Sequence, residues 1–463
     1  MANYRSFLRG KTFVLKGNFG ETGRGEWGWK LTAGSGKIQS MFSQYSRFEL
    51  PNRLRVISVP MSGLSSATAL VLVGAGSRYE QKDKAGLSHF LEHMIFKGTK
   101  KRPTAFDISS LVDSVGGENN AFTSKDQTGY YIKLQTEHLR LAFDILSDTL
   151  RNSLFLQEEI DRERGAIIEE INMYEDTPLY KIDDVFYELM FNGNPLGWPT
   201  AGDKKTVANI RREDFLNYTN RFYQGSDMVL AVAGRVDAQE VKSLAEEYFS
   251  SFTPGQKEKF VEFGNGQDKP RVRVEHKKTD QAHLYLGYPA FSFRHPDRPV
   301  LEVLSAILGG GMSSRLFIQV RERRGLAYYV SSTTDLYHET GLLAARAGLN
   351  LGKVAEAVEV ILEEFAKIKR GEVTKTELAK AKEFLKGRAI LRLENSRATA
   401  EWYAEKELLE GKIETPDEEF AKIGKVTLED IKRVSQEIIK EKKVNLAIIG
   451  PYEDQEQFLK LLS

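Results

Sequence analysis

The sequence contains one helix-and-strand pattern twice, and this repeat restricts the folds that the chain can adopt. Residues 214–234 and residues 430–450 each predict an amphipathic helix followed by an apolar strand that ends in glycine. The two segments have the same length and the same order of features. Self-similarity of this kind is typical of a duplicated structural unit. We therefore expect the 463 residues to form two related domains.

Short apolar runs and long amphipathic helices occur in both halves of the chain. Runs at residues 54–59, 68–73 and 130–134 predict strands in the first half, and runs at 283–288 and 342–347 predict strands in the second. Neighbouring strands without an intervening helix favour antiparallel pairing. We therefore expect an α+β fold with two homologous domains, each a mainly antiparallel sheet with helices packed on one side.

Composition predicts where these domains begin and end. Residues 1–41 form an atypical basic, glycine-rich arm without the apolar core of a secretory signal. We expect the first domain at residues 42–255 and the second, related domain at residues 270–463. Residues 256–269 between them are poor in apolar side chains and are expected to form a linker.

Residues 89–93 read H-x-x-E-H, and this motif predicts a metal site. The whole chain has only seven histidines. Residues four apart stack on one face of a helix, so His89 and His93 can reach the same ion. Glu92 borders that face and can take a proton from an attacking water without binding the metal. The spacing also fits a half-buried histidine pair that binds nothing, but the apolar residues around it predict a well-anchored helix.

A zinc site of this kind needs a third protein ligand from elsewhere in the fold. The best candidate segment is residues 163–171, which belongs to a charged helix predicted at about residues 157–173. Glu163 and Glu170 lie seven residues apart and share one helix face. Either could bind the metal while the other supports the site from behind.

The stretch GLSHFLEHMIFKGT resembles the signature of the pitrilysin family of zinc metallopeptidases, M16, which includes insulin-degrading enzyme and the mitochondrial processing peptidases. The similarity extends from about residue 42 to the C-terminus. The glycine-rich segment at residues 309–316 resembles the short version of a family loop, not the long loop of the non-catalytic processing subunit. The resemblance implies a short, single-half member of this family.

The resemblance also implies the identity of the third ligand. In the family this ligand is a glutamate on a later helix. Matching the pattern E-R-x-x-x-I-E-E places the ligand at Glu170, with Glu169 as the alternative. The same match implies that Glu163 supports the site as a neighbouring acid. With the two histidines, Glu170 would hold one zinc ion per chain.

Two further segments resemble family elements that contact the substrate. The segment GGENNAFT is similar to an edge strand that pairs with the substrate backbone, which implies that Asn120 and Ala121 bind peptide. The segment RERRGLAY resembles an R-x-x-x-x-L-x-Y element. This match implies that Arg321 and Tyr328 bind the substrate and stabilise the oxyanion at the scissile carbonyl.

The resemblance thus implies a zinc-dependent endopeptidase that hydrolyses peptides or unfolded polypeptide segments. Larger family members resemble two such chains in tandem, so we expect a homodimer in which each zinc site faces the partner subunit's Arg321 and Tyr328. One alternative is a catalytically inactive processing partner or scaffold of the same family, against which the intact motif argues. Another is a metal-dependent hydrolase of a non-peptide substrate, against which the edge-strand segment argues.

Composition excludes several other classes of function. The formal net charge of +1 argues against nucleic acid as the main partner. No apolar run is long enough to span a bilayer, so no membrane partner is expected. The chain has no cysteine, which excludes disulfides and thiolate zinc sites and fits a cytoplasmic location.

Overall fold

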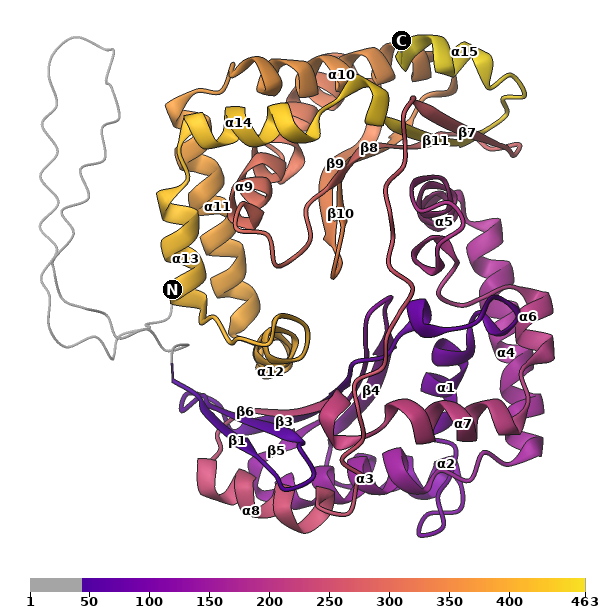
Figure 1. Cartoon of the computed structure of the whole chain (residues 1–463), viewed down its shortest axis with the longest axis vertical. Helices are drawn as coiled ribbons and strands as arrows, with labels where there is room; N and C mark the ends of the chain where they lie inside the picture. Colours follow the sequence, from indigo (N-terminus) through magenta and orange to yellow (C-terminus); the bar gives the residue numbers. More distant parts are fainter. Residues whose placement is uncertain (1–43, 463) are drawn as a thin grey trace, which may run out of the picture. The chain divides into compact units, whose positions relative to one another are not determined.

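Two sheets form the framework of the structure, a computed structural model that describes residues 44–462 (Figure 1). In spatial order the first sheet contains β1 (Ser46–Glu49), β2 (Arg55–Pro60), β6 (Met228–Gly234), β3 (Ser66–Val73), β5 (Thr128–Gln135) and β4 (Glu118–Thr123). The second contains β7 (Arg271–His276), β11 (Asn445–Gly450), β8 (Ala282–Ala290), β10 (Gly341–Leu349) and β9 (Ala327–Leu336).

The two sheets repeat one topology, which confirms the duplication expected from the sequence. Replacing β2, β6, β3, β5 and β4 by β7, β11, β8, β10 and β9 gives the strand order of the second sheet. The pairs β2–β6 and β7–β11 are parallel, and the other neighbouring strands in this order pair antiparallel. The predicted α+β class with two mainly antiparallel sheets is therefore confirmed. All five predicted strands are present.

The helices lie between and around these strands. Those of the first half are α1 (Leu87–Ile95), α2 (Ala105–Ser114), α3 (Leu139–Asn152), α4 (Gln157–Asp176), α5 (Pro178–Met190), α6 (Lys204–Asn209), α7 (Arg212–Phe222) and α8 (Ala238–Phe249). Those of the second half are α9 (Arg298–Gly309), α10 (Val354–Arg370), α11 (Lys375–Leu393), α12 (Ser396–Glu405), α13 (Pro416–Lys425), α14 (Leu428–Ile438) and α15 (Glu456–Leu459).

No regular element occurs between α8 and β7, where the linker was predicted. The exact domain boundaries stay a prediction, and the predicted arm at residues 1–41 lies outside the described residues. Among residues 44–462, no helix combines the length and the apolar character that crossing a membrane requires.

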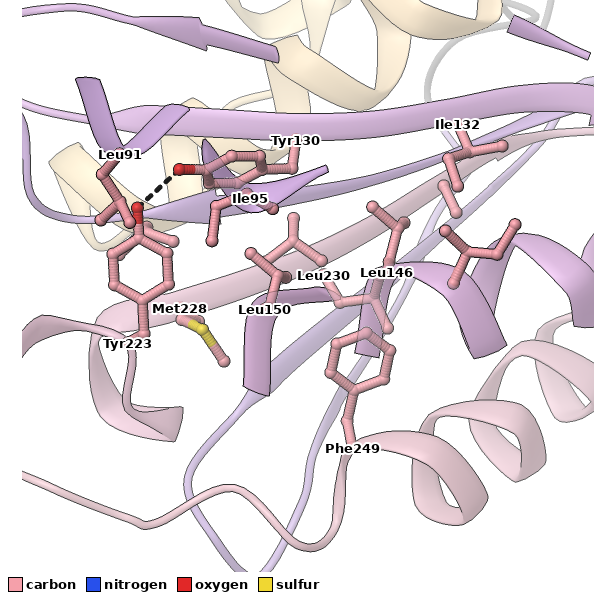
Figure 2. Packing of buried hydrophobic residues seen from close by; sticks show 14 of the residues in the cluster. Leu91, Ile95, Tyr130, Ile132, Leu146, Leu150, Tyr223, Met228, Leu230 and Phe249 are labelled. Carbon is pink, nitrogen blue, oxygen red and sulfur yellow. Dashed lines mark hydrogen bonds between the residues drawn. The ribbon is translucent and has the colours of Figure 1, made fainter. Parts of the chain in front are cut away.

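The helix α1 is anchored to the first sheet by an apolar core. Figure 2 shows Leu91 and Ile95 of α1 close to Tyr130 of β5 and to Tyr223, which follows α7. The hydroxyl groups of the two tyrosines are hydrogen-bonded at 2.7 Å, so neither polar atom is buried without a partner. Burying a large apolar side chain stabilises a fold by about 1.5–3 kcal/mol. This packing fixes the direction in which the opposite, polar face of α1 points.

In each sheet, a helix from the other half of the chain packs on the face opposite to the sheet's own helices. The sequence pattern did not predict this arrangement. The helix α12 packs on β3 and β6 of the first sheet, where Thr68 and Ser396 share a hydrogen bond of 2.8 Å (Figure 1). The helix α5 packs on β8 and β11 of the second sheet, where the rings of Phe186 and Tyr285 stack at 4.2 Å. This reciprocal exchange joins the two halves through two apolar clusters.

Candidate metal centre and active site

A buried carboxylate and a glycine with a positive φ fix the start of α1. Glu80 accepts hydrogen bonds from the backbone amides of Gly86 and Ser88 at 2.8 and 2.6 Å. Gly86 has a positive φ of 96°, and a Cβ there would lie 2.6 Å from the carbonyl oxygen of Ala201. These constraints fix where the helix begins and therefore how its polar face is turned.

The polar face of α1 presents His89 and His93 to a carboxylate of α4. The Nε2 atoms of both histidines lie 3.6 Å from Oε2 of Glu170. One potential ligand atom from each residue lies within 4.8 Å of the others. Glu169, the alternative ligand, is exposed and is not part of this cluster. The structure thus brings together the predicted histidines and Glu170.

A second carboxylate of α4 sets the tautomer of one histidine. Oε1 of Glu163 lies 2.9 Å from Nδ1 of His93, and Lys97 pairs with the other oxygen at 2.5 Å. The hydrogen bond from His93 is the largest effect that lowers the pKa of Glu163 to about 2, against the opposing effect of burial. A carboxylate in this state accepts the Nδ1 proton and orients the ring, and Nε2 of His93 lies on the side of the cluster.

The cluster fits a zinc ion by its donor chemistry. Two imidazole nitrogens and one carboxylate oxygen form a ligand set that zinc hydrolases use, with a fourth position open. Burial, and then the neighbouring His93, lower the pKa of His89 to about 4, so its imidazole is neutral and able to bind metal near pH 7. Nδ1 of His89 is buried and has no hydrogen-bond partner among the described residues.

Another acidic cluster lacks these properties. Glu410, Glu414 and Glu419 also place oxygens within 4.8 Å of one another. Lys406 pairs with Glu410 at 2.7 Å and with Glu419 at 2.6 Å, so their charges are already neutralised. Because a lysine ammonium group already binds these carboxylates, the acidic cluster does not need a metal cation. The histidine cluster contains no described lysine.

Glu92 stands beside the histidine cluster without contributing an atom to it. The hydroxyl of Thr123, at the end of β4, donates a hydrogen bond of 2.7 Å to its carboxylate. Burial raises the pKa of Glu92, and the hydrogen bond from Thr123 opposes this effect. The carboxylate is therefore fixed in position while one of its oxygens stays available for proton transfer.

The edge strand β4 runs past this carboxylate, as the sequence predicted for the segment GGENNAFT. It pairs with β5 on one side, and no other described strand pairs with it. Cavities of about 340 and 480 Å³ adjoin the cluster, and Glu92 and Ala121 line both. Asn120 lines the smaller one.

The structure does not bring Arg321 and Tyr328 to the histidine cluster within one chain. Arg321 lies in a π-helical segment (Phe317–Glu322), and Tyr328 lies on β9, the edge strand of the second sheet. The guanidinium of Arg321 is 5.9 Å from the centre of the Tyr328 ring, and Tyr328 is 74% exposed. Neither residue lines the two cavities beside the cluster.

Three side chains that support this site were not predicted from the sequence. Thr123 binds Glu92, Lys97 binds Glu163, and the hydroxyl of Tyr174 donates a hydrogen bond of 3.0 Å to Glu170. Tyr174 follows Glu170 by four residues within α4, so helical i, i+4 spacing could have identified it as a neighbour. Lys97 lies just beyond the end of α1, where that spacing does not apply.

The chain matches known proteins over most of its length. A family model described as "Insulinase (Peptidase family M16)" matches residues 55–204, and one described as "Peptidase M16 inactive domain" matches residues 209–385. An uncharacterized zinc protease of Streptomyces coelicolor is 36% identical over 416 residues, covering 89% of this chain and 90% of that protein. The uncharacterized zinc protease YmxG of Bacillus subtilis is 35% identical over 409 residues, covering 88% and 98%.

Two solved structures also have the fold of this chain. A protease from Helicobacter pylori superposes with a TM-score of 0.83 at 27% identity, over 89% of this chain and 100% of that one. A structure titled as a peptidase M16 inactive domain from Pseudomonas fluorescens shares the fold, with a TM-score of 0.82 at 16% identity over 89% and 99%. The chain belongs to the M16 family of peptidases. The H-x-x-E-H motif lies in the part that matches the insulinase model, outside the part that matches the inactive domain.

Proposed function

We propose that this chain is a zinc-dependent endopeptidase that hydrolyses peptides or unfolded polypeptide segments. The observation that carries the proposal is the convergence of His89, His93 and Glu170 beside a separate carboxylate, Glu92. These three residues would hold one zinc ion per chain. When bound, zinc would polarise a water molecule and the scissile carbonyl and lower the pKa of that water.

Glu92 is proposed as the base and then the acid of the reaction. Its carboxylate would accept a proton from the attacking water and later deliver it to the nitrogen of the leaving amine. The hydrogen bond from Thr123 supports this role because it restricts the rotation of the carboxylate. Glu163 would keep His93 in the tautomer that leaves its Nε2 free.

The edge of β4 is proposed as the place where the substrate backbone binds. An unpaired strand edge offers N–H and C=O groups to an extended peptide, and only an unfolded segment can adopt that shape. Asn120 and Ala121 lie on this strand beside Glu92. The cavities on both sides of the cluster would then receive side chains that flank the cleaved bond.

The test compares two glutamine substitutions and measures zinc content and peptide cleavage together. Glu92→Gln should keep zinc, because Glu92 supplies no ligand atom, yet lose about 10²–10⁴-fold in kcat. The matched control Glu169→Gln changes an exposed glutamate and should keep both properties. Full activity of zinc-loaded Glu92→Gln would refute the mechanism, and a wild-type chain without zinc affinity would favour the scaffold alternative.

We further propose a homodimer with composite active sites. Arg321 and Tyr328 are exposed on their own half, so they are free to reach a zinc site on another copy. A Glu92→Gln chain and an Arg321→Ala/Tyr328→Ala chain, each inactive alone, should regain activity when mixed, because one complete site forms per heterodimer. Demonstrated subunit exchange without recovered activity would mean that each site is completed within one chain.

A further inference from the structure

A cavity of about 540 Å³ lies between the two halves, apart from the histidine cluster. From the first half it is lined by residues 124–127, which directly follow β4, and from the second half by residues of α9, β9 and α12. Its volume is typical of sites that bind small molecules. None of the proposed zinc ligands lines it.

Four cationic side chains line this cavity, and each already has a partner. Lys125 donates a hydrogen bond to the carbonyl oxygen of Trp198. Lys406 binds the carboxylates of Glu410 and Glu419, and Arg298 binds the same two residues. Arg392 pairs at 3.3 Å with Glu401, which does not line the cavity. These cations therefore do not neutralise the remaining acids of the cavity wall.

Three carboxylates of the wall are left without a close cationic partner among the described residues. Glu302 has its nearest ion-pair contact at 3.9 Å, to Nε of Arg298. Asp335 accepts a hydrogen bond from the hydroxyl of Tyr187, and Glu405 accepts one of 2.6 Å from Nε2 of Gln127. Burial raises the pKa of all three carboxylic acids, as expected where negative charge is poorly compensated.

A buried amide oxygen in the same wall also lacks a partner. Gln127 is only 5% exposed, and among residues 44–462 nothing donates a hydrogen bond to its Oε1. Leaving such an acceptor unpaired in the interior is costly. A ligand that donates hydrogen bonds would satisfy this oxygen and the carboxylate of Glu405 beside it.

The other residues that line the cavity indicate which kind of cation, a metal ion or an organic cation, it would bind. Glu302, Asp335 and Glu405 do not converge on one point. Among the described residues, the acidic and histidine groups close enough to hold one ion together are the two clusters given above. Five aromatic side chains also line the cavity, and aromatic faces attract organic cations. These aromatic residues are Tyr187, Phe293, Tyr337, Trp402 and Phe420.

We propose that this cavity is a binding site for a small organic cation, whose ammonium or guanidinium group donates to Glu405 and to Oε1 of Gln127. The apolar part of the ligand would contact the aromatic lining. A free polyamine and a short arginine-containing peptide fragment share this chemistry. The site is independent of the proposed peptidase reaction.

Titration calorimetry on the zinc-loaded full chain tests the site with two probes, spermidine and arginine amide. Saturable binding of at least one probe is expected. Tighter binding of spermidine indicates a site for alkylammonium groups, and tighter binding of arginine amide indicates a site for a guanidinium group. Glu405→Gln should weaken it roughly tenfold to hundredfold, the size expected when a hydrogen bond to a charged group is lost. The matched control Glu394→Gln changes an exposed glutamate that does not line the cavity, and it should bind within about twofold of the wild type.

Further measurements keep the proposal falsifiable if one variant folds poorly. Gln127→Leu removes the unpaired acceptor and should weaken binding as well, and thermal unfolding checks that each variant is folded. Mg²⁺ alone should not displace the bound probe. The proposal is overturned if neither probe binds, if folded Glu405→Gln binds as tightly as the wild type, or if Mg²⁺ competes with the probe.

Discussion

The helices α1 and α9 occupy the same topological place in the two halves, yet only α1 carries histidines, the residues of the proposed metal centre. Each helix follows the strand that stands third in the shared order, β3 or β8. On α9 most side chains are buried, because α11, α13 and α14 pack against it. On α1 one face is buried in the core, and the other faces α4 and the open edge strand. The two equivalent positions therefore differ in the side chains that they carry and in the elements packed around them.

The contact between each helix and its edge strand shows the same difference. In the first half the hydroxyl of Thr123 donates to the carboxylate of Glu92 at 2.7 Å. In the second half two hydroxyl groups, those of Ser305 and Ser332, meet at 2.9 Å. The serine pair can join helix to strand but has no group that takes up a proton near neutral pH. The corresponding contact on α1 contains a carboxylate, which the proposed mechanism uses as base and then as acid.

The largest expected effect comes from breaking the metal cluster itself. Glu170→Gln should weaken zinc binding by more than about 100-fold, because losing a ligand costs more than losing a supporting group. Glu169→Gln, the exposed neighbour, should change zinc affinity little. Zinc competition with a chelator measures both. If Glu169→Gln is instead the variant that loses metal, the assignment of the ligand is wrong by one residue.

A smaller effect is expected from the contacts between helix and strand. Thr123→Val should lower kcat about tenfold to hundredfold, since the hydrogen bond to the charged Glu92 is lost. Zinc content and KM should stay near wild type, and Thr123→Ser, which restores the hydroxyl, should recover most of the rate.

The second half provides the control for this test. Ser332→Ala removes the corresponding contact to Ser305 and should leave kcat unchanged. Equal losses of kcat in Thr123→Val and Ser332→Ala would mean that both contacts act only through general stability.

The smallest effect on activity is expected from the two helix starts, where the measured property is how stability depends on pH. Burial raises the folded-state pKa of Glu80 to about 7, above its ordinary value of 4.5, so between these values the folded protein holds a proton that the unfolded chain releases. This contribution is complete below the unfolded-state pKa and is lost as the pH rises through about 7. We expect Glu80→Gln to remove a pH dependence on the order of 3 kcal/mol in this window.

At the start of α9 the sign is opposite. The hydrogen bond from Arg433 lowers the pKa of Asp297, so its contribution is present above the unfolded-state pKa and is lost only as the pH falls below it. Denaturant unfolding of Glu80→Gln and Asp297→Asn across pH measures both. A stability difference between wild type and Glu80→Gln that does not change from about pH 5 to pH 8 would contradict the assignment.

Much of this arrangement could be predicted from local sequence. Strand runs of alternating or continuous apolar residues identified β2, β3, β5, β8 and β10, because strand formation here follows burial on the pleated surface. The H-x-x-E-H spacing placed two imidazoles on one helix face, since helical periodicity is a local property. The exchange of α5 and α12 between the sheets could not be predicted, because an amphipathic face does not specify which sheet will cover it.

The sequence by itself determined the two related sheets, the helix that carries His89 and His93, and a nearby glutamate pair as candidates for the third ligand. Only the tertiary structure decided that Glu170 faces the histidines while Glu169 is exposed. It also decided that Thr123 holds Glu92 and that Gln127 and Glu405 meet across the two halves. The physical reason is that periodicity fixes which residues share a face, whereas the rotation and contacts of that face depend on packing between segments distant in sequence.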